Sequence, residues 1–326
     1  MSFKDILGHE KLIHHLKKSI EMDKIGHAYI FDGPAGIGKK TTATAFSKGI
    51  LCKEFGQDVC GVCSSCLKIE SNNHPDLVWI EPDGKSIKNH QIEELQQDLV
   101  RKPYESEKKV YLIKDADLMT ESAQNRLLKT LEEPPRYVVI ILISTNFNRF
   151  LATIRSRSQI IKFNRLQYKI VQDFMHKRYG MNDDETKVFA TFSNGIIGKA
   201  IEFKESEDFQ KKRKETIALI EGLISKDALK LFDGMVFFEK YKEDVYEILD
   251  LMIFWFRDIL LLGEMNSEQF LINIDQKDIL QKHLYHISHQ KMVHIIETIE
   301  KTKKDIKANV NFQLATEIMI LRIQEV

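Results

Sequence analysis

Apolar positions in the first half of the chain form short runs that alternate with longer stretches of helical periodicity. The runs cover residues 28–31, 77–80, 110–113, 138–143 and 160–163. Short strands that alternate with helices are typical of βαβ units and a parallel sheet. The run 138–143 is apolar throughout, which predicts a central strand buried on both faces.

The second half reads as successive amphipathic helices. All six prolines lie at or before Pro135, and proline interrupts helices. Apolar residues recur there at helical spacing in two stripes, one with Leu249, Met252, Ile253, Phe256 and Leu260 and the other with Val310, Leu314, Ile318 and Leu321. Such stripes are typical of core packing or of helix bundles. The pattern therefore predicts an α/β part followed by an all-α part.

Length and charge limit the class of protein. A chain of 326 residues has room for roughly two or three domains. Lys+Arg and Asp+Glu are equal at 48 each, so no net charge draws the chain to nucleic acid or a membrane, and any DNA contact is local or shared with partner chains. The longest apolar run, around 251–256, is too short to cross a bilayer, and the first residues lack a signal-peptide pattern. We expect a cytoplasmic protein without a membrane partner.

A phosphate-binding loop of the form G-x-x-x-x-G-K follows the first apolar run. Gly33, Gly36 and Gly38 allow the loop to curl, and Lys39 is its phosphate-binding lysine. The next position normally carries a Ser or Thr whose hydroxyl binds Mg²⁺, but here it is Lys40. An ammonium group donates hydrogen bonds and binds no cation. Nucleotide binding without turnover and a loop kept only for the fold both remain open.

The strand predicted over 110–113 lacks the acidic residues of an active ATPase. Such a strand ends in an Asp for the metal and, in many ATPases, a Glu for the attacking water, whereas Lys114 and Asp115 follow here. A shift by one residue makes Asp115 the metal ligand but puts Ala116 at the position of the base, because strand side chains alternate. Mg²⁺-dependent hydrolysis therefore has no evident route.

All four cysteines lie close together in the spacing C-x7-C-x2-C-x2-C, as Cys52, Cys60, Cys63 and Cys66. Disulfides are not expected in the cytosol, so this spacing predicts a tetrahedral all-cysteine zinc site. The protein fills all four positions and leaves none for water, which makes the zinc structural. Four free thiols on a loop are the alternative.

Two segments carry a family resemblance. Residues 125–135 read Asn-Arg-Leu-Leu-Lys-Thr-Leu-Glu-Glu-Pro-Pro, and residues 153–158 read Thr-Ile-Arg-Ser-Arg-Ser. Both resemble the signature of bacterial clamp-loader subunits of the AAA+ class. In that family a Ser-Arg-Cys motif carries an arginine finger, which reaches into the ATP site of the neighbouring subunit. The resemblance implies that Arg157 is this finger, and Ser158 in place of the cysteine leaves the guanidinium intact.

The resemblance also implies a domain organisation. The family inserts a zinc module after the P-loop helix, where the four cysteines lie. The implied domains are an AAA+ P-loop domain with a parallel sheet over residues 1–165, a small helical lid domain over 166–205 and a helical collar domain over 206–326 that holds subunits in a ring.

Within the family, Lys40 and Lys114 point to the delta-prime class, which completes the ring without being a motor. The resemblance then implies a non-hydrolysing stator that acts with motor (gamma/tau) and delta subunits of DNA polymerase III to load the sliding clamp onto primer-template DNA. One alternative is a self-sufficient gamma/tau-like ATPase whose metal is held by Thr41 and by Asp115 or Asp117. Thr41 lies one residue late, a rotation of about 100° on a helix. A scaffold unrelated to clamps is a third possibility.

Two charged clusters also need an interpretation. His283, His286 and His289 recur every three residues, but their helix offers no fourth metal ligand at a plausible offset, so we interpret them as surface histidines. The basic run 211–214 is flanked by glutamates. We interpret that run as a solvated helix face rather than a DNA contact.

Overall fold

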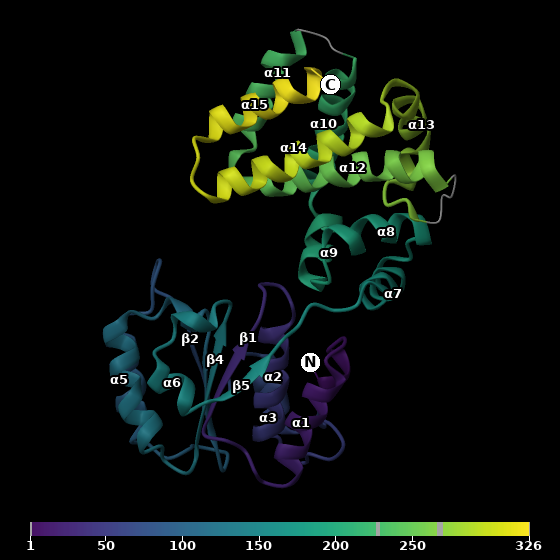
Figure 1. Cartoon of the computed structure of the whole chain (residues 1–326). Helices are drawn as coiled ribbons and strands as arrows, with labels where there is room; N and C mark the ends of the chain where they lie inside the picture. Colours follow the sequence, from purple (N-terminus) through teal and green to yellow (C-terminus); the bar gives the residue numbers. More distant parts are fainter. Residues whose placement is uncertain (1, 226–228, 266–269, 326) are drawn as a thin grey trace. The chain divides into compact units, whose positions relative to one another are not determined.

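The computed structural model describes residues 2–225, 229–265 and 270–325 and contains two compact units (Figure 1). One unit consists of Met1–Ile170 and Gly195–Gly198, and the other of Val171–Asn194 and Lys199–Val326. Positions 226–228, 266–269 and 326 of the predicted collar lie outside the described residues. None of the helices in the described ranges combines the length and apolar character that a bilayer crossing needs.

The first unit is built on a parallel sheet with the strand order β2-β3-β4-β1-β5. The strands are β1 (Ala28–Asp32), β2 (Leu77–Ile80), β3 (Lys109–Ile113), β4 (Val138–Ser144) and β5 (Gln159–Lys162). All five predicted strands are confirmed to within one residue at each end. β4 is the middle strand and is buried along its whole length, as its unbroken apolar run predicts.

Helices cover both faces of this sheet, with α5 on one side of the strands and α1 and α2 on the other (Figure 1). The helices are α1 (Glu10–Glu21), α2 (Lys39–Leu51), α3 (Ser64–Glu70), α4 (Asn89–Leu99), α5 (Glu121–Glu132) and α6 (Ala152–Ser156), with short 3-10 turns at Phe3–Asp5, Ala116–Leu118 and Phe147–Arg149. Ile140 and Leu142 of β4 pack in the core under α4 and α5, whereas Ile141 and Ile143 pack in the core under α1 and α2. Alternate side chains of one strand thus serve two cores.

Parallel pairing brings the carboxyl ends of the strands to one edge of the sheet. Asp32 pairs in register with Ser144 on one side and with Lys162 on the other. The polar residues that follow β1, β3 and β4 therefore gather at this edge, which is where open α/β sheets place their ligand sites.

Helices are the only regular secondary structure among the described residues of the second unit. Its elements are most of α7 (Tyr168–Tyr179), then α8 (Asp183–Phe192), α9 (Ile197–Glu205), α10 (Glu207–Ile224), α11 (Leu229–Lys240), η4 (Lys242–Asp244), α12 (Val245–Met265), η6 (Ile274–Gln276), α13 (Lys277–His286), α14 (His289–Lys307) and α15 (Phe312–Glu325). Leu249, Met252 and Phe256 of α12 are fully buried, which confirms that the first apolar stripe packs in a core. The fold class predicted from the sequence, α/β followed by all-α, is confirmed.

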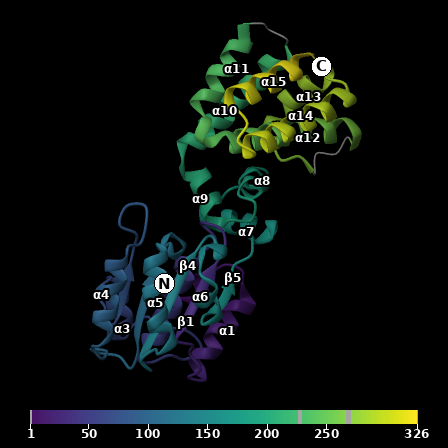
Figure 2. The same ribbon diagram turned by 60° about the vertical axis from the view of Figure 1, so that its left-hand side comes forward.

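The second apolar stripe faces outward, with Val310 in the short loop after α14 and the other three residues on α15. Val310, Leu314, Ile318 and Leu321 are 44, 52, 41 and 48 % exposed. Core packing within this chain is therefore the wrong interpretation for these residues. The opposite face of α15, with Ala315, Met319, Ile320 and Ile323, is the one that is buried, and α15 runs beside α14 (Figure 2).

Both charged clusters are partly buried. His283 is only 4 % exposed, and its Nδ1 accepts a hydrogen bond from Trp255 Nε1 at 3.1 Å, whereas His286 and His289 are exposed. The surface interpretation is therefore wrong for His283. It is also wrong for two residues of the basic run.

Lys212 and Arg213 are buried, whereas Lys211 and Lys214 are exposed. Lys212 Nζ lies 2.7 Å from Asp208 and 2.8 Å from Asp244. Arg213 forms an ion pair with Asp275 at 2.6 Å. A buried charge needs such a partner, so these two basic residues hold helices of the second unit together.

Candidate functional sites

The phosphate loop joins β1 to α2 at the carboxyl edge of the sheet. Gly33 N–H donates to Ser144 O at 3.3 Å. Gly38 is the N-cap of α2 with φ 103°, a left-handed conformation that glycine adopts without strain. Gly36 O accepts from Gly198 N–H at 2.9 Å, and a methyl group on Gly198 would lie 2.7 Å from Gly36 Cα. The backbone of the loop is therefore held from both sides.

Lys39 turns back onto its own loop. Its Nζ donates to Gly33 O at 2.6 Å and to Pro34 O at 2.7 Å, and the side chain is almost completely buried. Burial lowers the pKa of Lys39, because the charged form loses its hydration. The ammonium group that would bind phosphate has carbonyl partners within the loop instead.

Three carboxylates lie close enough to Lys39 to oppose this lowering of its pKa, namely Asp32, Asp117 and Asp115 in order of effect. Asp117 is bound elsewhere, since it accepts from Thr145 N–H and Thr145 Oγ1, both at 3.1 Å. Asp32 has a buried Oδ1 without a hydrogen-bond partner among the described residues. Negative charge at this place disfavours a polyphosphate.

The two lysines at the positions of metal ligands both contact residues at the end of β2. Lys40 Nζ lies 5.1 Å from the centroid of the Trp79 ring, within the range of a cation–π contact. Lys114 Nζ lies 3.4 Å from Glu81 Oε1. Neither side chain offers an oxygen ligand, so no metal-binding set is completed at these two positions.

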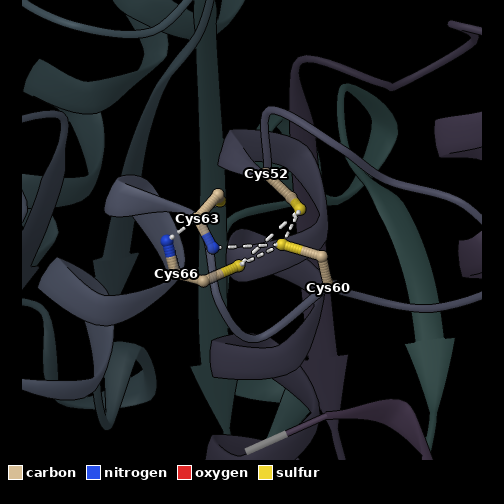
Figure 3. A group of neighbouring side chains, drawn as sticks. All are labelled: Cys52, Cys60, Cys63 and Cys66. Carbon is tan, nitrogen blue, oxygen red and sulfur yellow. Dashed lines mark hydrogen bonds between the residues drawn. The ribbon is translucent and has the colours of Figure 1, made fainter.

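The four cysteines converge on one point between α2 and α3 (Figure 3). Their Sγ atoms all lie within 4.8 Å of one another. The distances are 3.6 Å from Cys52 to Cys60, 3.6 Å from Cys52 to Cys66 and 3.8 Å from Cys60 to Cys66. Cys52 is the C-cap of α2, and Cys63 is the N-cap of α3. The cluster can bind a metal ion.

Backbone N–H groups point at these sulfurs. Cys63 N–H donates to Cys60 Sγ at 3.3 Å, and Cys66 N–H donates to Cys63 Sγ at 3.5 Å. Burial opposes ionisation of Cys63, but the N–H groups of Cys66 and Lys53 and the neighbouring thiols outweigh it and lower its pKa to about 6. The thiolate is the form that binds metals.

A short chain of hydrogen bonds fixes α3 behind the cysteines. Ser65 Oγ donates to Leu51 O at 2.6 Å and lies 2.7 Å from His74 Nε2, while His74 Nδ1 accepts from Asp76 N–H at 3.1 Å. His74 is therefore protonated on Nε2, and burial lowers its pKa and keeps it neutral. This arrangement orients Cys66, the next residue after Ser65.

Arg157 follows α6 as its C-cap and is bound within its own chain. Its Nη2 lies 2.9 Å from Glu132 Oε1. Its Nη1 donates to Thr153 O at 3.2 Å and to Ser156 Oγ at 3.4 Å. The guanidinium is 35 % exposed, so it lies at the surface but has defined partners.

The sequence matches two family models. One, described as DNA polymerase III, delta subunit, covers residues 8–167, and the other, described as DNA polymerase III, delta subunit, C terminal, covers residues 207–325. DNA polymerase III subunit delta' of Bacillus subtilis is 35 % identical over 313 residues, which is 95 % of this chain and 94 % of that protein. The chain belongs to the DNA polymerase III delta-prime family.

This delta-prime family member is also similar to other subunits of the polymerase. DNA polymerase III subunit gamma/tau of Mycoplasma genitalium is 28 % identical over 351 residues, which is all of this chain and 57 % of that protein. A gamma-subunit-related protein from Thermotoga maritima superposes with a TM-score of 0.42 at 17 % identity, covering 95 % of this chain and 98 % of that one.

In this delta-prime family member the predicted site residues lie at three places, namely the phosphate loop from Gly33 to Lys39, the cysteine cluster and Arg157. Two residues that matter there were not predicted. Asp32 directly precedes the loop, so the sequence alone could have predicted a carboxylate near the phosphate-binding lysine. Glu132 was part of the recognised signature, but only the fold brings it to Arg157.

Proposed function

We propose that this chain is a non-hydrolysing clamp-loader subunit of the delta-prime type. It would complete the loader ring as a stator, donate Arg157 to the ATP site of a neighbouring motor subunit, and so help load the sliding clamp onto primer-template DNA. Its partners would be gamma/tau and delta subunits, because the relatives it resembles are DNA polymerase III subunits with those names.

One observation carries the non-hydrolysing part of this proposal. Lys39 donates to Gly33 O and Pro34 O, and the side chain of Lys40 lies against Trp79. The gamma/tau-like alternative needs a metal held by Thr41 and an aspartate, but Asp117 is already hydrogen-bonded to Thr145. Phosphoryl transfer depends on a metal that neutralises the developing charge, and this loop has no complete ligand set for one.

The proposed role of Arg157 rests on its place and exposure. It follows α6 and precedes the first residue of β5 by two positions, which places it at the amino edge of the parallel sheet, and it is exposed enough for a second chain to reach. A guanidinium supplied by another chain stabilises the transition state and accelerates hydrolysis by roughly 10³ to 10⁵ in NTPases that use one. Hydrolysis in the motor subunit would then depend on assembly with this chain.

We also propose that the metal of the cysteine cluster is zinc. Tetrahedral zinc has Zn–S bonds of about 2.3 Å, which places its sulfur ligands about 3.8 Å apart. Three Sγ–Sγ distances in the cluster are 3.6, 3.6 and 3.8 Å. Four protein ligands leave no position for a substrate, so the zinc would be structural.

The exposed stripe on α15 supports a collar domain that holds subunits together. We propose that Val310, Leu314, Ile318 and Leu321 pack against the corresponding helix of a neighbouring loader subunit. The gamma/tau relative aligns over the whole of this chain, so such a partner would have a matching helix to offer. We also propose the division into residues 1–165, 166–205 and 206–326, which the extents of the two family models, 8–167 and 207–325, support.

The test is steady-state ATP hydrolysis with Mg²⁺, first by the purified chain alone and then by a loader reconstituted with gamma/tau and delta subunits. We expect no turnover by the chain alone, and strong loss of loader turnover when Arg157→Ala replaces the natural chain. Arg155→Ala is the matched control, since Arg155 lies over the Phe147 ring in the same segment. Turnover by the chain alone that Lys39→Ala abolishes would instead identify a motor.

A further inference from the structure

Arg157 lies in a negatively charged environment within its own chain. Glu132, whose carboxylate is 2.9 Å from Nη2, is the last residue of α5. Thr153 O, which accepts from Nη1, lies in the short helix α6 that Arg157 itself ends. Helix carboxyl ends carry partial negative charge and favour cations. The side chain is therefore held by a carboxylate, a carbonyl and two helix ends together.

The proposed finger role and the ion pair with Glu132 require different partners for the same Arg157 guanidinium. A finger acts by donating to the oxygens of a phosphoryl group. Glu132 occupies Nη2, and a carboxylate that stays beside the guanidinium also repels the phosphates. The guanidinium has to leave Glu132 to act fully on a phosphate.

The pair with Glu132 is weak enough to be exchanged. The side chains of Arg157 and Glu132 are 35 and 50 % exposed, and ion pairs with that much solvent contact alter an equilibrium by at most about five-fold. Assembly with a chain that carries a nucleoside triphosphate can therefore break the ion pair between Arg157 and Glu132.

We propose that Glu132 is a positioning residue that holds Arg157 in the unassembled chain and yields it to the phosphate of the neighbouring subunit's nucleotide. This inference rests on the proposed function, because it needs Arg157 to be a finger. Glu132 thereby competes with the phosphate for Arg157, and the loader's hydrolysis is restrained until assembly brings the nucleotide close.

The test compares Glu132→Gln with Glu133→Gln in the reconstituted loader. Glutamine keeps the size of residue 132 and removes its charge. We expect Glu132→Gln to raise kcat/KM for ATP by about two- to five-fold, the range that an exposed ion pair allows. Glu133 is the adjacent exposed carboxylate and is the C-cap of α5, so Glu133→Gln should leave kcat/KM unchanged.

A double substitution separates this inference from the finger itself. If Arg157→Ala lowers turnover and Glu132→Gln raises kcat/KM only when Arg157 is present, Glu132 acts through Arg157. If Arg157→Ala lowers turnover but Glu132→Gln does not raise it, the competition is refuted and the finger stands. If Arg157→Ala has no effect, both proposals fail.

The pair can also be measured without partners. In ¹⁵N NMR of the isolated chain, Glu132→Gln should shift the Arg157 guanidinium resonances and speed rotation about its Cζ–N bonds, while Glu133→Gln should not. Arg157 resonances that are the same in all three proteins would overturn the inference whatever the loader assay gives.

Discussion

Lys40 stands where a phosphate loop normally places the hydroxyl that binds Mg²⁺, and its side chain lies over Trp79. Lys114 stands where the metal-binding acid belongs and pairs with Glu81. Each of the two lysines thus has its own partner at the end of β2. The loss of the metal site is therefore spread over separate positions, and a single substitution does not reverse it.

Lys40→Thr restores the loop motif, and we expect it to leave the isolated chain without ATP turnover. Lys114 still replaces the acid, and Asp117 stays bound to Thr145. The measurement is steady-state hydrolysis with Mg²⁺, with Lys40→Thr/Lys114→Asp as the companion protein. Turnover by Lys40→Thr alone would contradict our account of the site.

His283 predicts how the stability of the second unit depends on pH. Burial lowers its pKa below the usual 6.5, with Glu221 opposing and His286 and Lys282 reinforcing this shift. The unfolded chain then binds a proton more readily than the folded one, so the stabilisation is complete above about pH 6.5 and is lost as the pH falls towards the folded pKa.

We therefore expect Tm to fall between about pH 7 and about pH 5, and His283→Gln to fall less steeply. Glutamine can still accept from Trp255 Nε1, which separates the effect of charge from that of the lost hydrogen bond. Calorimetry of both proteins across this range is the measurement. His74, which is also buried with a lowered pKa, should leave a residual slope, and identical slopes would rule out His283 as a contributor.

At the scale of elements, α3 illustrates a helix that depends on its surroundings. Ser64–Glu70 is only seven residues long, and helices of this length are unstable alone. It is held by Cys63 at its start, by Cys66 in the cluster, and by the contact of Ser65 with His74. Binding of a metal and folding of this segment should therefore be coupled.

Removal of the metal should unfold the cysteine module without unfolding the sheet. We expect one zinc per chain by elemental analysis. The substitution Cys60→Ser, or treatment with a strong chelator, should remove this zinc. Hydrogen exchange should then become fast in α3 and the loop before it, while β4, buried throughout, keeps its protection. Val62→Ala, at an exposed position between the ligands, is the control and should keep its zinc.

The strands could be predicted from the sequence, whereas the partner of the α15 stripe could not, and both outcomes have a physical reason. The run 138–143 is apolar on both strand faces, and only a central strand has both faces covered. A helical stripe such as Leu314 and Ile318 shows that one face seeks an apolar partner, but not whether that partner belongs to the same chain. The pairing of Arg157 with Glu132 was also out of reach, since the fold alone brings these residues together.

For the whole molecule, the outward stripe of α15 means that the isolated chain leaves apolar surface in contact with water. Exposed apolar patches commonly mark interaction sites. Pockets lie on two sides of α15, one lined with Val236 and Phe312 and the other with Val310 and Leu314. The exposed apolar side chains of α15, with a pocket on either side, fit the packing of another helix.

Leu314→Asp or Ile318→Asp should weaken assembly with gamma/tau and delta subunits by about ten- to a hundred-fold, as expected for a buried interface residue. Both side chains are exposed, so the thermal unfolding of the isolated chain should change little. The measurement is gel filtration or sedimentation of the mixed subunits. Tyr285→Asp, at an exposed position of α13, is the control, and full assembly of the α15 variants would exclude this helix from the interface.

Lys39 and its two carbonyl partners have a consequence for the physiology of replication. As long as Lys39 keeps its hydrogen bonds to Gly33 O and Pro34 O, the ratio of ATP to ADP does not enter the contacts of this loop. A loader that contains such a subunit would sense the energy supply only through its motors. Nutrient limitation would then change the rate of ATP hydrolysis by the motor subunits and leave the conformation of this phosphate loop unaltered.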